Sequence, residues 1–351
     1  MSFQTEALVE VMRGGRLESE HRGAIAVVDA AGKLIAHAGD PDLVTYLRSS
    51  AKPFQLLPLV ESGGADRLGL SDRELAIVAG SHSGEPRHVE TVQSILGKIG
   101  LTEDALQCGA HVPFNAESAR ALRDSGRAPT PISNNCSGKH AGMLAQAIDR
   151  GLSTRDYLDP NHPVQGNIRE ALADLAGVSF DQVGVGVDGC SAPCFALSLR
   201  SAALAFANLA SLPPFTEGGQ EGGQADRRCA ALARIANAMM TYPEMVAGEG
   251  RLDTDLMRAA KGRVVCKGGA EGFHGIGLMS ADGRPAWGIA LKIGDGDGQR
   301  SGHPVVIEVL RQLGVLDDAA LAALQSYRGW VVTNHRGLEV GEVRTNFTLR
   351  K

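Results

Sequence analysis

One short segment places a hydroxyl and an amine at a spacing suited to nucleophilic chemistry. In RSSAK, residues 48–52, Ser49 and Lys52 stand three positions apart and would share one face of a helix. A serine attacks a carbonyl only when a base takes its proton, and a lysine is such a base only when burial or nearby cations lower its pKa. The same residues also fit a helix-capping serine followed by a solvated lysine. Ser50, directly beside Ser49, leaves the identity of the attacking hydroxyl open.

A second amine lies far along the chain, at the end of the strand-like segment 263–267 (RVVCK), where Lys267 is followed by Gly268 and Gly269. Serine enzymes that carry Ser-x-x-Lys usually also have a Lys-Thr-Gly strand across the site. Here Gly268 stands in place of the hydroxyl residue, but glycines allow backbone N–H groups to approach a developing oxyanion. We therefore expect this segment to form one wall of an active site. The neighbouring thiol of Cys266 has no assigned role.

A third region carries ligands typical of zinc. Cys136 lies in NNCSGKH, residues 134–140, and Cys190 ends the segment DGC about fifty residues further on. Two thiolates and one further donor form a zinc site. On ligand chemistry alone, His140 is the preferred third donor. A helix start with two structural cysteines is the alternative interpretation.

The composition argues against several classes of function. The 351 residues include 35 Lys and Arg and 40 Asp and Glu, for a net charge of −5, and aromatic residues make up 4%. No run of basic residues is available to neutralise phosphates, so nucleic acid is not an expected partner. No apolar run reaches the roughly 18 residues of a membrane helix, and residues 1–23 lack the apolar core of a signal peptide. We expect a soluble, cytoplasmic protein with reduced cysteines and no membrane partner.

The pattern of apolar residues predicts the elements that must position these groups. Residues 24–30 and 33–38 predict a hairpin, and 263–267, 286–293 and 329–333 are strand-like, whereas the segments between carry helical spacing. Strands at both ends of the chain predict an α+β fold in which the two ends pair into one antiparallel sheet. We expect residues 1–50 and 263–351 to form this sheet lobe, and residues 51–262 to form an inserted, mainly helical lobe. The low-complexity stretch 213–224 predicts a mobile loop, with an active-site lid as the alternative.

Five motifs, in this order along the chain, resemble those of the rhizobial-type, class 3 L-asparaginases. They are RSSAKPFQ (48–55), GSHSGEPRH (80–88), NNCSGKHAGML (134–144), VDGCSAP (187–193) and VVCKGGAEG (264–272). The resemblance spans nearly the whole chain. It implies a fold similar to that of the serine β-lactamases and penicillin-binding enzymes, a homodimer, and hydrolysis of L-asparagine to L-aspartate and ammonia.

The resemblance also implies residue roles. It pairs Ser49 with Lys52, and Ser81 with Lys267, as two Ser-Lys tandems. It further implies one zinc ion per subunit, and the ligands would be Cys136, Lys139, Cys190 and a water molecule, so that Lys139 replaces His140 as the third protein donor. Five more residues are expected to recognise the substrate or support the site, namely Arg48, Asn135, His140, Asp188 and Gly268.

Two other functions remain open from the sequence. The nearest is another amidase on the same scaffold, either a glutaminase or a serine hydrolase similar to D,D-peptidases. The other, from a different class, is a non-catalytic protein that binds zinc or an amino acid and retains only the pocket. The presence of both Ser-Lys pairs argues against the second.

Overall fold

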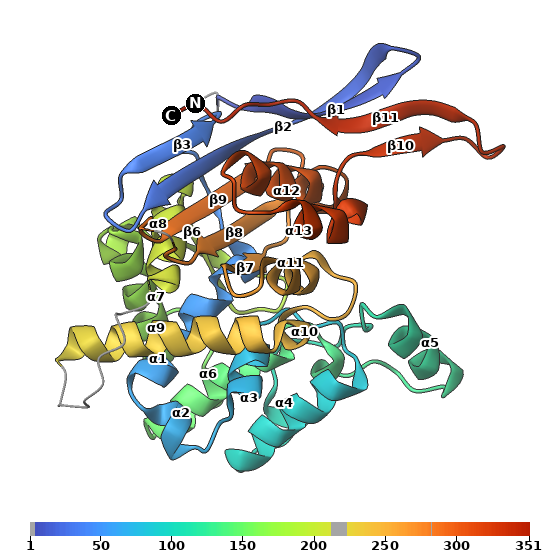
Figure 1. The fold of residues 1–351 in the computed structure, drawn as a ribbon. Coiled ribbons are helices and arrows are strands. Elements are labelled where there is room, and N and C mark those ends of the chain that lie inside the picture. The colour runs from blue at the N-terminus through green and yellow to red at the C-terminus, as the bar shows by residue number, and fades with distance from the viewer. Residues whose placement is uncertain (1–3, 212–222, 282) are drawn as a thin grey trace.

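Both ends of the chain contribute to one large antiparallel sheet (Figure 1). The computed structural model describes residues 4–211, 223–281 and 283–351. Within these residues the sheet has eight strands in the order β10-β11-β1-β2-β9-β8-β7, and β3 pairs with β2. The strands are β1 (Glu6–Arg13), β2 (Arg16–Asp29), β3 (Leu34–Ala38), β7 (Val264–Gly268), β8 (Phe273–Leu278), β9 (Trp287–Ile293), β10 (Trp330–Thr333) and β11 (Glu339–Thr345).

The first strand joins the two ends of the chain. β1 pairs with β2 on one side and with β11 on the other, and Val11 lies opposite Val343 in this second pairing. The guanidinium of Arg344 donates to the carboxylate of Glu10 at 3.0 Å across the same pair of strands. The N- and C-terminal segments therefore lie side by side, and the β1–β2 and β10–β11 hairpins extend together beyond the body of the protein (Figure 1).

One helix from the middle of the chain packs directly on the sheet. α8 (Leu199–Ala210) contacts β2, β8 and β9. A Cβ atom added to Gly288 of β9 would lie 1.8 Å from the carbonyl oxygen of Ala203, and one added to Gly275 of β8 would lie 1.9 Å from the ring of Phe206. Glycine is therefore required where the helix backbone approaches these strands most closely. Three further helices on the sheet side are α11 (Leu252–Ala260), α12 (His303–Gln312) and α13 (Asp318–Ala323).

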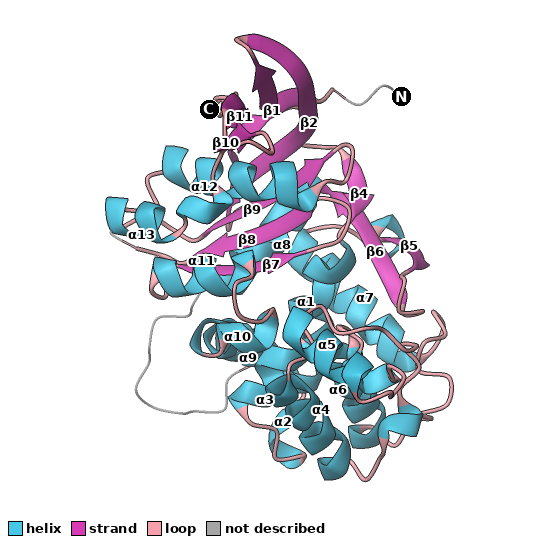
Figure 2. Ribbon diagram, turned by 90° about the vertical axis from the view of Figure 1, so that its right-hand side faces the viewer, coloured by secondary structure: helices cyan, strands magenta, loops and turns pink. Residues whose placement is uncertain are grey.

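The remaining helices surround a central helix, α1 (Lys52–Glu61), whose residues 52–60 are all buried. A helix that is buried on every side lies in the core of its lobe. α6, α7 and α9 pack against α1, and Figure 2 shows this helical region on one side of the sheet. The helices of this region are α2 (Gly64–Arg67), α3 (Asp72–Val78), α4 (Pro86–Lys98), α5 (Ala116–Asp124), α6 (Ser137–Asp149), α7 (Pro163–Ala176), α9 (Gln224–Thr241) and α10 (Pro243–Val246), and α5 lies at its edge, away from α1 (Figure 1).

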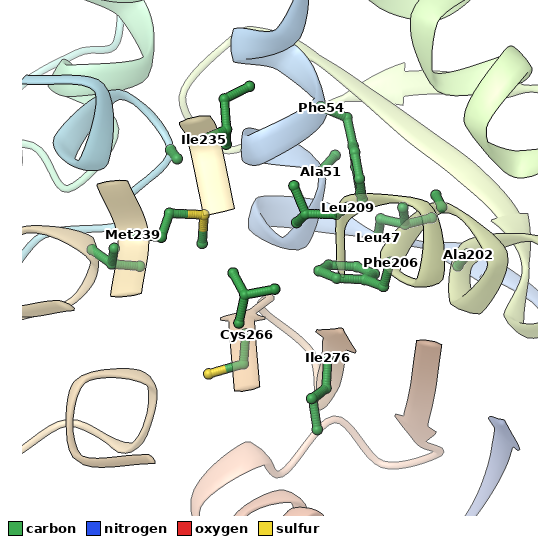
Figure 3. Packing of buried hydrophobic residues seen from close by; sticks show 14 of the residues in the cluster. Leu47, Ala51, Phe54, Ala202, Phe206, Leu209, Ile235, Met239, Cys266 and Ile276 are labelled. Atoms are coloured by element: carbon green, nitrogen blue, oxygen red, sulfur yellow. The ribbon is translucent and has the colours of Figure 1, made fainter. Parts of the chain in front are cut away.

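The hydrophobic core continues from the helices to the sheet. Figure 3 shows Phe54 of α1 beside Phe206 of α8, whose ring centres are 5.0 Å apart, edge to face. Met239 of α9, Cys266 of β7 and Ile276 of β8 complete this region. The start of α1 is thereby fixed against the end of β7, where the candidate residues lie.

The predicted α+β architecture is confirmed, with both chain ends in one antiparallel sheet. The predicted hairpin is the β2–β3 pair. The sequence analysis did not predict β1, β8 and β11, nor a small second sheet of β4 (Val44–Tyr46), β6 (Pro193–Ser198) and β5 (Gly184–Val187). The proposed lobe boundaries stay a prediction, although α8 packs on the sheet despite its place in the middle of the chain.

Two further predictions concern segments rather than elements. Most of the predicted mobile loop at 213–224 lies outside the described residues, and α9 begins at Gln224. Among the described residues, no helix has the length and apolar character needed to span a membrane.

Candidate active site

A cleft of about 510 Å³ lies where the turn before α1, the end of β7 and the start of α11 meet. Ser49, Ser81, Asn135 and Gly268, all predicted site residues, line it. Charged and imidazole side chains also line it, namely Arg251, Asp253, Glu271, His274, Asp297 and His303. A larger hollow of about 780 Å³ over α1, α7 and α9 contains none of the predicted site residues.

The two adjacent serines before α1 have different surroundings. Arg48 has a φ of 51°, and the short turn that follows brings Ser50 into the interior. The buried Ser50 hydroxyl donates to the backbone carbonyl of Lys267 at 2.5 Å. Ser49 is half-buried and lines the cleft, and its hydroxyl forms no hydrogen bond with the residues that the structure describes. Of the two hydroxyls, Ser49 is the one free to meet a ligand.

Lys52 is buried by its place as the first residue of the central helix. Its Nζ donates to the carbonyl of Gly80 at 2.7 Å, to Oγ of Ser81 at 2.9 Å and to the carbonyl of Asn135 at 3.3 Å. Burial lowers the pKa of Lys52, because an ammonium loses its hydration in the interior. The thiols of Cys136 and Cys190 oppose this effect and favour the charged amine, whereas the neighbouring charge of Lys139 adds to the lowering.

The hydrogen bond of Lys52 differs from the Ser-Lys pairing that the resemblance implies. Lys52 donates to Ser81 and forms no hydrogen bond with Ser49 among the described residues. Within the described chain, no hydrogen bond joins Ser81 to Lys267. Both serines line the same cleft, however, and the positive charge of Lys52 is close enough to lower the pKa of Lys267.

Lys267 lies at the end of β7 beside a buried carboxylate. Its Nζ donates to the carbonyl of Gly268 at 2.7 Å and lies 3.4 Å from Oδ2 of Asp253. Burial lowers the pKa of Lys267 to about 8, against the opposing effect of Asp253. Asp253 also accepts a hydrogen bond from the Gly268 amide at 2.9 Å and lies 3.1 Å from Nε2 of His274. Although burial alone would raise it, the pKa of Asp253 is held well below its usual value by Lys267 and His274.

The glycines after Lys267 do not supply the free amides that we expected. The N–H of Gly268 donates to Asp253, and the N–H of Gly269 donates to the carbonyl of Phe273 at 2.8 Å. The expectation that these amides face a developing oxyanion is therefore wrong, because both already have acceptors in the protein. Gly268 still lines the cleft, where its lack of a side chain leaves room for a ligand.

The thiols and the amine of the third region come together as the resemblance implies. Cys136 precedes the first residue of α6, Lys139 lies in the first turn, and Lys139 Nζ donates to Sγ of Cys190 at 3.0 Å. A hydrogen bond from Cys190 lowers the pKa of Cys136 well below its ordinary value, and Lys52 and Lys139 add to the shift despite burial. The two buried sulfur donors fit the ligand preferences of zinc. Against the effect of burial, the two thiols raise the pKa of Lys139, so its amine is charged here and would bind a metal only after losing a proton.

An ion pair supports the segment that carries Cys190. Nε of Arg48 donates to Oδ1 of Asp188 at 3.0 Å, and the Gly189 amide donates to the same oxygen at 2.8 Å. Although burial opposes it, the pKa of Asp188 is lowered by Lys139 and Arg48. Arg48 and Asp188 are not among the residues that line the cleft, and lie beside the thiol cluster instead.

His140 does not line the cleft, and no hydrogen bond joins it to a thiol among the described residues. Its Nδ1 lies 2.7 Å from the hydroxyl of Tyr157, and both side chains are fully buried. Burial lowers the pKa of His140 well below its usual value, so the ring is neutral. The residue-based choice of His140 as the third zinc donor therefore has no support in this geometry, whereas Lys139 contacts a thiol directly.

The sequence analysis did not single out several cleft residues, among them Arg251, Asp253, His274 and His303. Asp253 is a buried acid on the apolar face of an amphipathic helix, and such a residue usually has a functional or charged partner. His274 lies two positions beyond Gly272, the last residue of the fifth motif. The sequence therefore offered a reason to consider Asp253 and His274. It did not show that the segments carrying them meet in the fold.

Cleft-lining hydroxyls beside buried amines of lowered pKa are suited to nucleophilic attack on an acyl group. The family model described as L-asparaginase II matches residues 9–345, and the chain belongs to this family. The family indicates an amidohydrolase. No curated protein matches the chain.

Several solved structures are similar at low identity. A probable glutaminase from Bacillus subtilis, complexed with 6-diazo-5-oxo-L-norleucine, is 12% identical over 86% of this chain and 87% of that chain, with a TM-score of 0.39. A Bacillus glutaminase studied in 4.3 M NaCl is 13% identical over 84% of this chain and 91% of that one, with a TM-score of 0.39. Mglu in its tris and glutamate form is 15% identical over 89% of this chain, with a TM-score of 0.43, and this chain covers 63% of its length. Similarities of this size do not bear on the substrate.

Proposed function

We propose that this protein is an L-asparaginase that hydrolyses the side-chain amide of L-asparagine to L-aspartate and ammonia. The observation that carries the proposal is the buried amine of Lys52, hydrogen-bonded to Ser81 at 2.9 Å in a cleft that Ser49 also lines. The family match supports hydrolysis of a linear amide. The homodimer and the cytoplasmic location implied above stay predictions, and sedimentation of the purified protein tests the first.

A primary amide is a demanding substrate, because resonance stabilises it and ammonia is a poor leaving group. We assign the attack on the side-chain carbonyl to Ser49, with its proton passing to Lys52 directly or through the Ser81 hydroxyl. When the tetrahedral intermediate collapses, the C–N bond breaks and the departing nitrogen takes a proton from Ser81, which regains one from the ammonium of Lys52. Water then hydrolyses the ester on Ser49 and releases L-aspartate.

Burial favours a neutral Lys52, although the thiols of Cys136 and Cys190 favour its charged form. A neutral –NH₂ group has two N–H donors and one lone pair, and Lys52 has two carbonyl neighbours and one hydroxyl neighbour. The two donors would serve Gly80 and Asn135, and the lone pair would accept the hydroxyl proton of Ser81. Activity should therefore rise from pH 6 into the alkaline range, as buried lysines lose their protons. A pH-independent rate between 6 and 10 would exclude a neutral lysine as the base.

We also propose that Cys136, Lys139 and Cys190 hold a zinc ion, since their donor atoms and contacts fit that metal. Zinc, when bound, supplies a positive centre that orients a polar group of the substrate or braces the start of α6. Lys139 can serve as a ligand only after losing its proton, and two thiolates already offset much of the ion's charge. We favour positioning over Lewis-acid activation for this reason. Complete chelation with unchanged kcat and KM would leave the metal a structural role at most.

The decisive experiment combines substrate comparison with trapping. We expect ammonia release from L-asparagine at a much higher kcat/KM than from L-glutamine, and no stable acylation by a β-lactam. Mass spectrometry of the quenched enzyme should show the acyl group on the peptide that contains Ser49. Ser49→Ala should lower kcat on the order of 10³-fold or more while the fold is retained. Acylation mapped to Ser81 would reverse the assigned roles of the two serines, and faster turnover of glutamine would make the protein a glutaminase.

A further inference from the structure

Arg251, immediately before α11, is a cleft residue with no role in the proposed reaction. Its NH1 atom donates to the carbonyl of Ser81 at 2.7 Å and to the carbonyl of Ala247 at 3.3 Å. Its guanidinium carbon lies 5.5 Å from the ring centre of Phe114, which also lines the cleft. These contacts fix the guanidinium beside the backbone of Ser81.

The remaining donors of Arg251 have no acceptor among the described residues. Neither Nε nor NH2 forms a hydrogen bond or an ion pair with the part of the chain that the structure describes, and neither is sealed from the cleft. Arginine normally uses two parallel N–H groups to bind a carboxylate. Arg251 therefore presents an unused pair of donors to the cleft.

The acids near Arg251 do not neutralise it. Asp253 is engaged by Lys267, His274 and the Gly268 amide, and it lies beyond ion-pair distance of Arg251. Burial lowers the pKa of Arg251, and the charge of Asp253 only partly offsets this effect. A guanidinium remains protonated in proteins, so the site keeps a partly desolvated positive charge. An anionic ligand group would restore both its hydrogen bonds and its charge balance.

We propose that Arg251 binds the α-carboxylate of the amino-acid substrate and so selects α-amino acid amides over simple amides. This inference rests on the proposed function. In asparagine, two carbon atoms separate the α-carboxylate from the side-chain carbonyl under attack. A guanidinium anchored to the backbone of Ser81 is placed to hold that group while the side-chain amide reaches the hydroxyls. Arg251 is thus a substrate-binding residue, not a participant in the chemical steps.

The test compares substrates with and without the α-carboxylate. For L-asparagine, Arg251→Gln should lower kcat/KM roughly 10- to 100-fold, mainly through KM, because a charge-assisted pair is lost. For 3-aminopropanamide, which is asparagine without its α-carboxylate, the same variant should change kcat/KM less than about twofold. Arg251→Lys keeps the charge without the bidentate geometry and should give an intermediate loss on asparagine only. Arg258→Gln is the matched control, because Arg258 is exposed on the same helix and pairs with Glu249 at 2.6 Å.

A binding measurement separates this proposal from the proposed function. By calorimetry, the wild-type protein should bind L-aspartate more tightly than β-alanine, which lacks the α-carboxylate, and Arg251→Gln should lose that preference. Equal losses on asparagine and 3-aminopropanamide would mean that Arg251 only supports Ser81 and would overturn the proposal. An unchanged preference for aspartate in Arg251→Gln would overturn it as well. A wild-type protein that binds aspartate through Arg251 but releases no ammonia from asparagine would refute the proposed function alone.

Discussion

Neutralising Asp253 should move the pH profile of the enzyme towards acid. Asp253 lies 3.4 Å from the amine of Lys267, whose pKa is about 8, and its negative charge favours the protonated amine. An opposite charge at such a distance shifts a pKa by about 1 to 3 units. In Asp253→Asn, the pKa of Lys267 should therefore fall to roughly 5 to 7. The neutral fraction of Lys267 at pH 6 should rise from about one in a hundred to between one in ten and nine in ten.

The assay is ammonia release from L-asparagine, measured as kcat/KM from pH 5 to 10. If neutral Lys267 contributes to turnover, the rising limb should move to lower pH in Asp253→Asn, even if the plateau falls. Asp255→Asn is the matched control, because Asp255 lies on the same helix and pairs with the hydroxyl of Tyr327 at 2.6 Å, away from the cleft lining. An unshifted limb, or one moved to higher pH, would refute the assigned electrostatic coupling.

The same substitution has a consequence for stability. The folded-state pKa of Asp253 is depressed, so its contribution is present above the unfolded value near 4 and is lost as the pH falls through the folded value. Removing one member of a buried ion pair typically costs 3–5 kcal/mol. The cost should be at the lower end here, because Lys267 can release its proton and need not remain a buried cation. Urea unfolding at pH 7 measures it, and the pH profile is interpreted only if the variant is folded.

Five further substitutions, in three groups, test separate parts of the structure. Ser50→Ala should lower the free energy of unfolding by about 1–3 kcal/mol, since it leaves a buried carbonyl without its donor, and should preserve the pH profile of turnover; a loss of acylation would instead place Ser50 in the chemistry. Gly288→Ala should lower the free energy of unfolding by about 1–3 kcal/mol or more, because its Cβ would meet α8. Gly97→Ala, whose Cβ would have nothing within 4 Å, should instead stabilise α4 by about 0.5–1 kcal/mol. Equal urea midpoints for the two variants would contradict this packing. Lys139→Ala should lose bound zinc and His140→Ala should retain it, and metal analysis showing the opposite would reverse the choice of ligand.

Chemical motifs predicted more of the site than periodicity did. Ser49, Ser81, Asn135 and Gly268 line one cleft, although they lie in four separate segments of the chain. This information came from the resemblance of the motifs to a known family, since the sequence itself shows no contact between the four segments. Hydrophobic patterning predicted β2, β3 and most helices, but missed β1 and β11. These two strands are rich in charged residues, and their pairing with each other joins segments from the two ends of the chain.

The sequence did not allow contacts between distant segments of the chain to be predicted. The motifs suggested that Ser81 would pair with Lys267, yet Lys52 contacts Ser81, because the direction of a side chain at a helix start depends on where the helix is placed. The burial of Lys52 follows from the packing of helices around α1, and it is burial that makes an amine a base. No pattern within the segment RSSAK distinguishes Ser49 from Ser50; the carbonyl that occupies Ser50 belongs to Lys267, more than two hundred positions away.

The amino-acid sequence by itself determined the kinds of reactive group, the α+β class and the family, because these depend on residue identity and on local periodicity. The tertiary structure alone decided which amine meets which hydroxyl, which glycine amides are already occupied, and that Arg251 faces the cleft with donors to spare. The physical reason is that pKa values and hydrogen-bond satisfaction depend on the dielectric surroundings and on neighbours contributed by remote parts of the chain. Those surroundings exist only once α1, β7 and α11 have packed together.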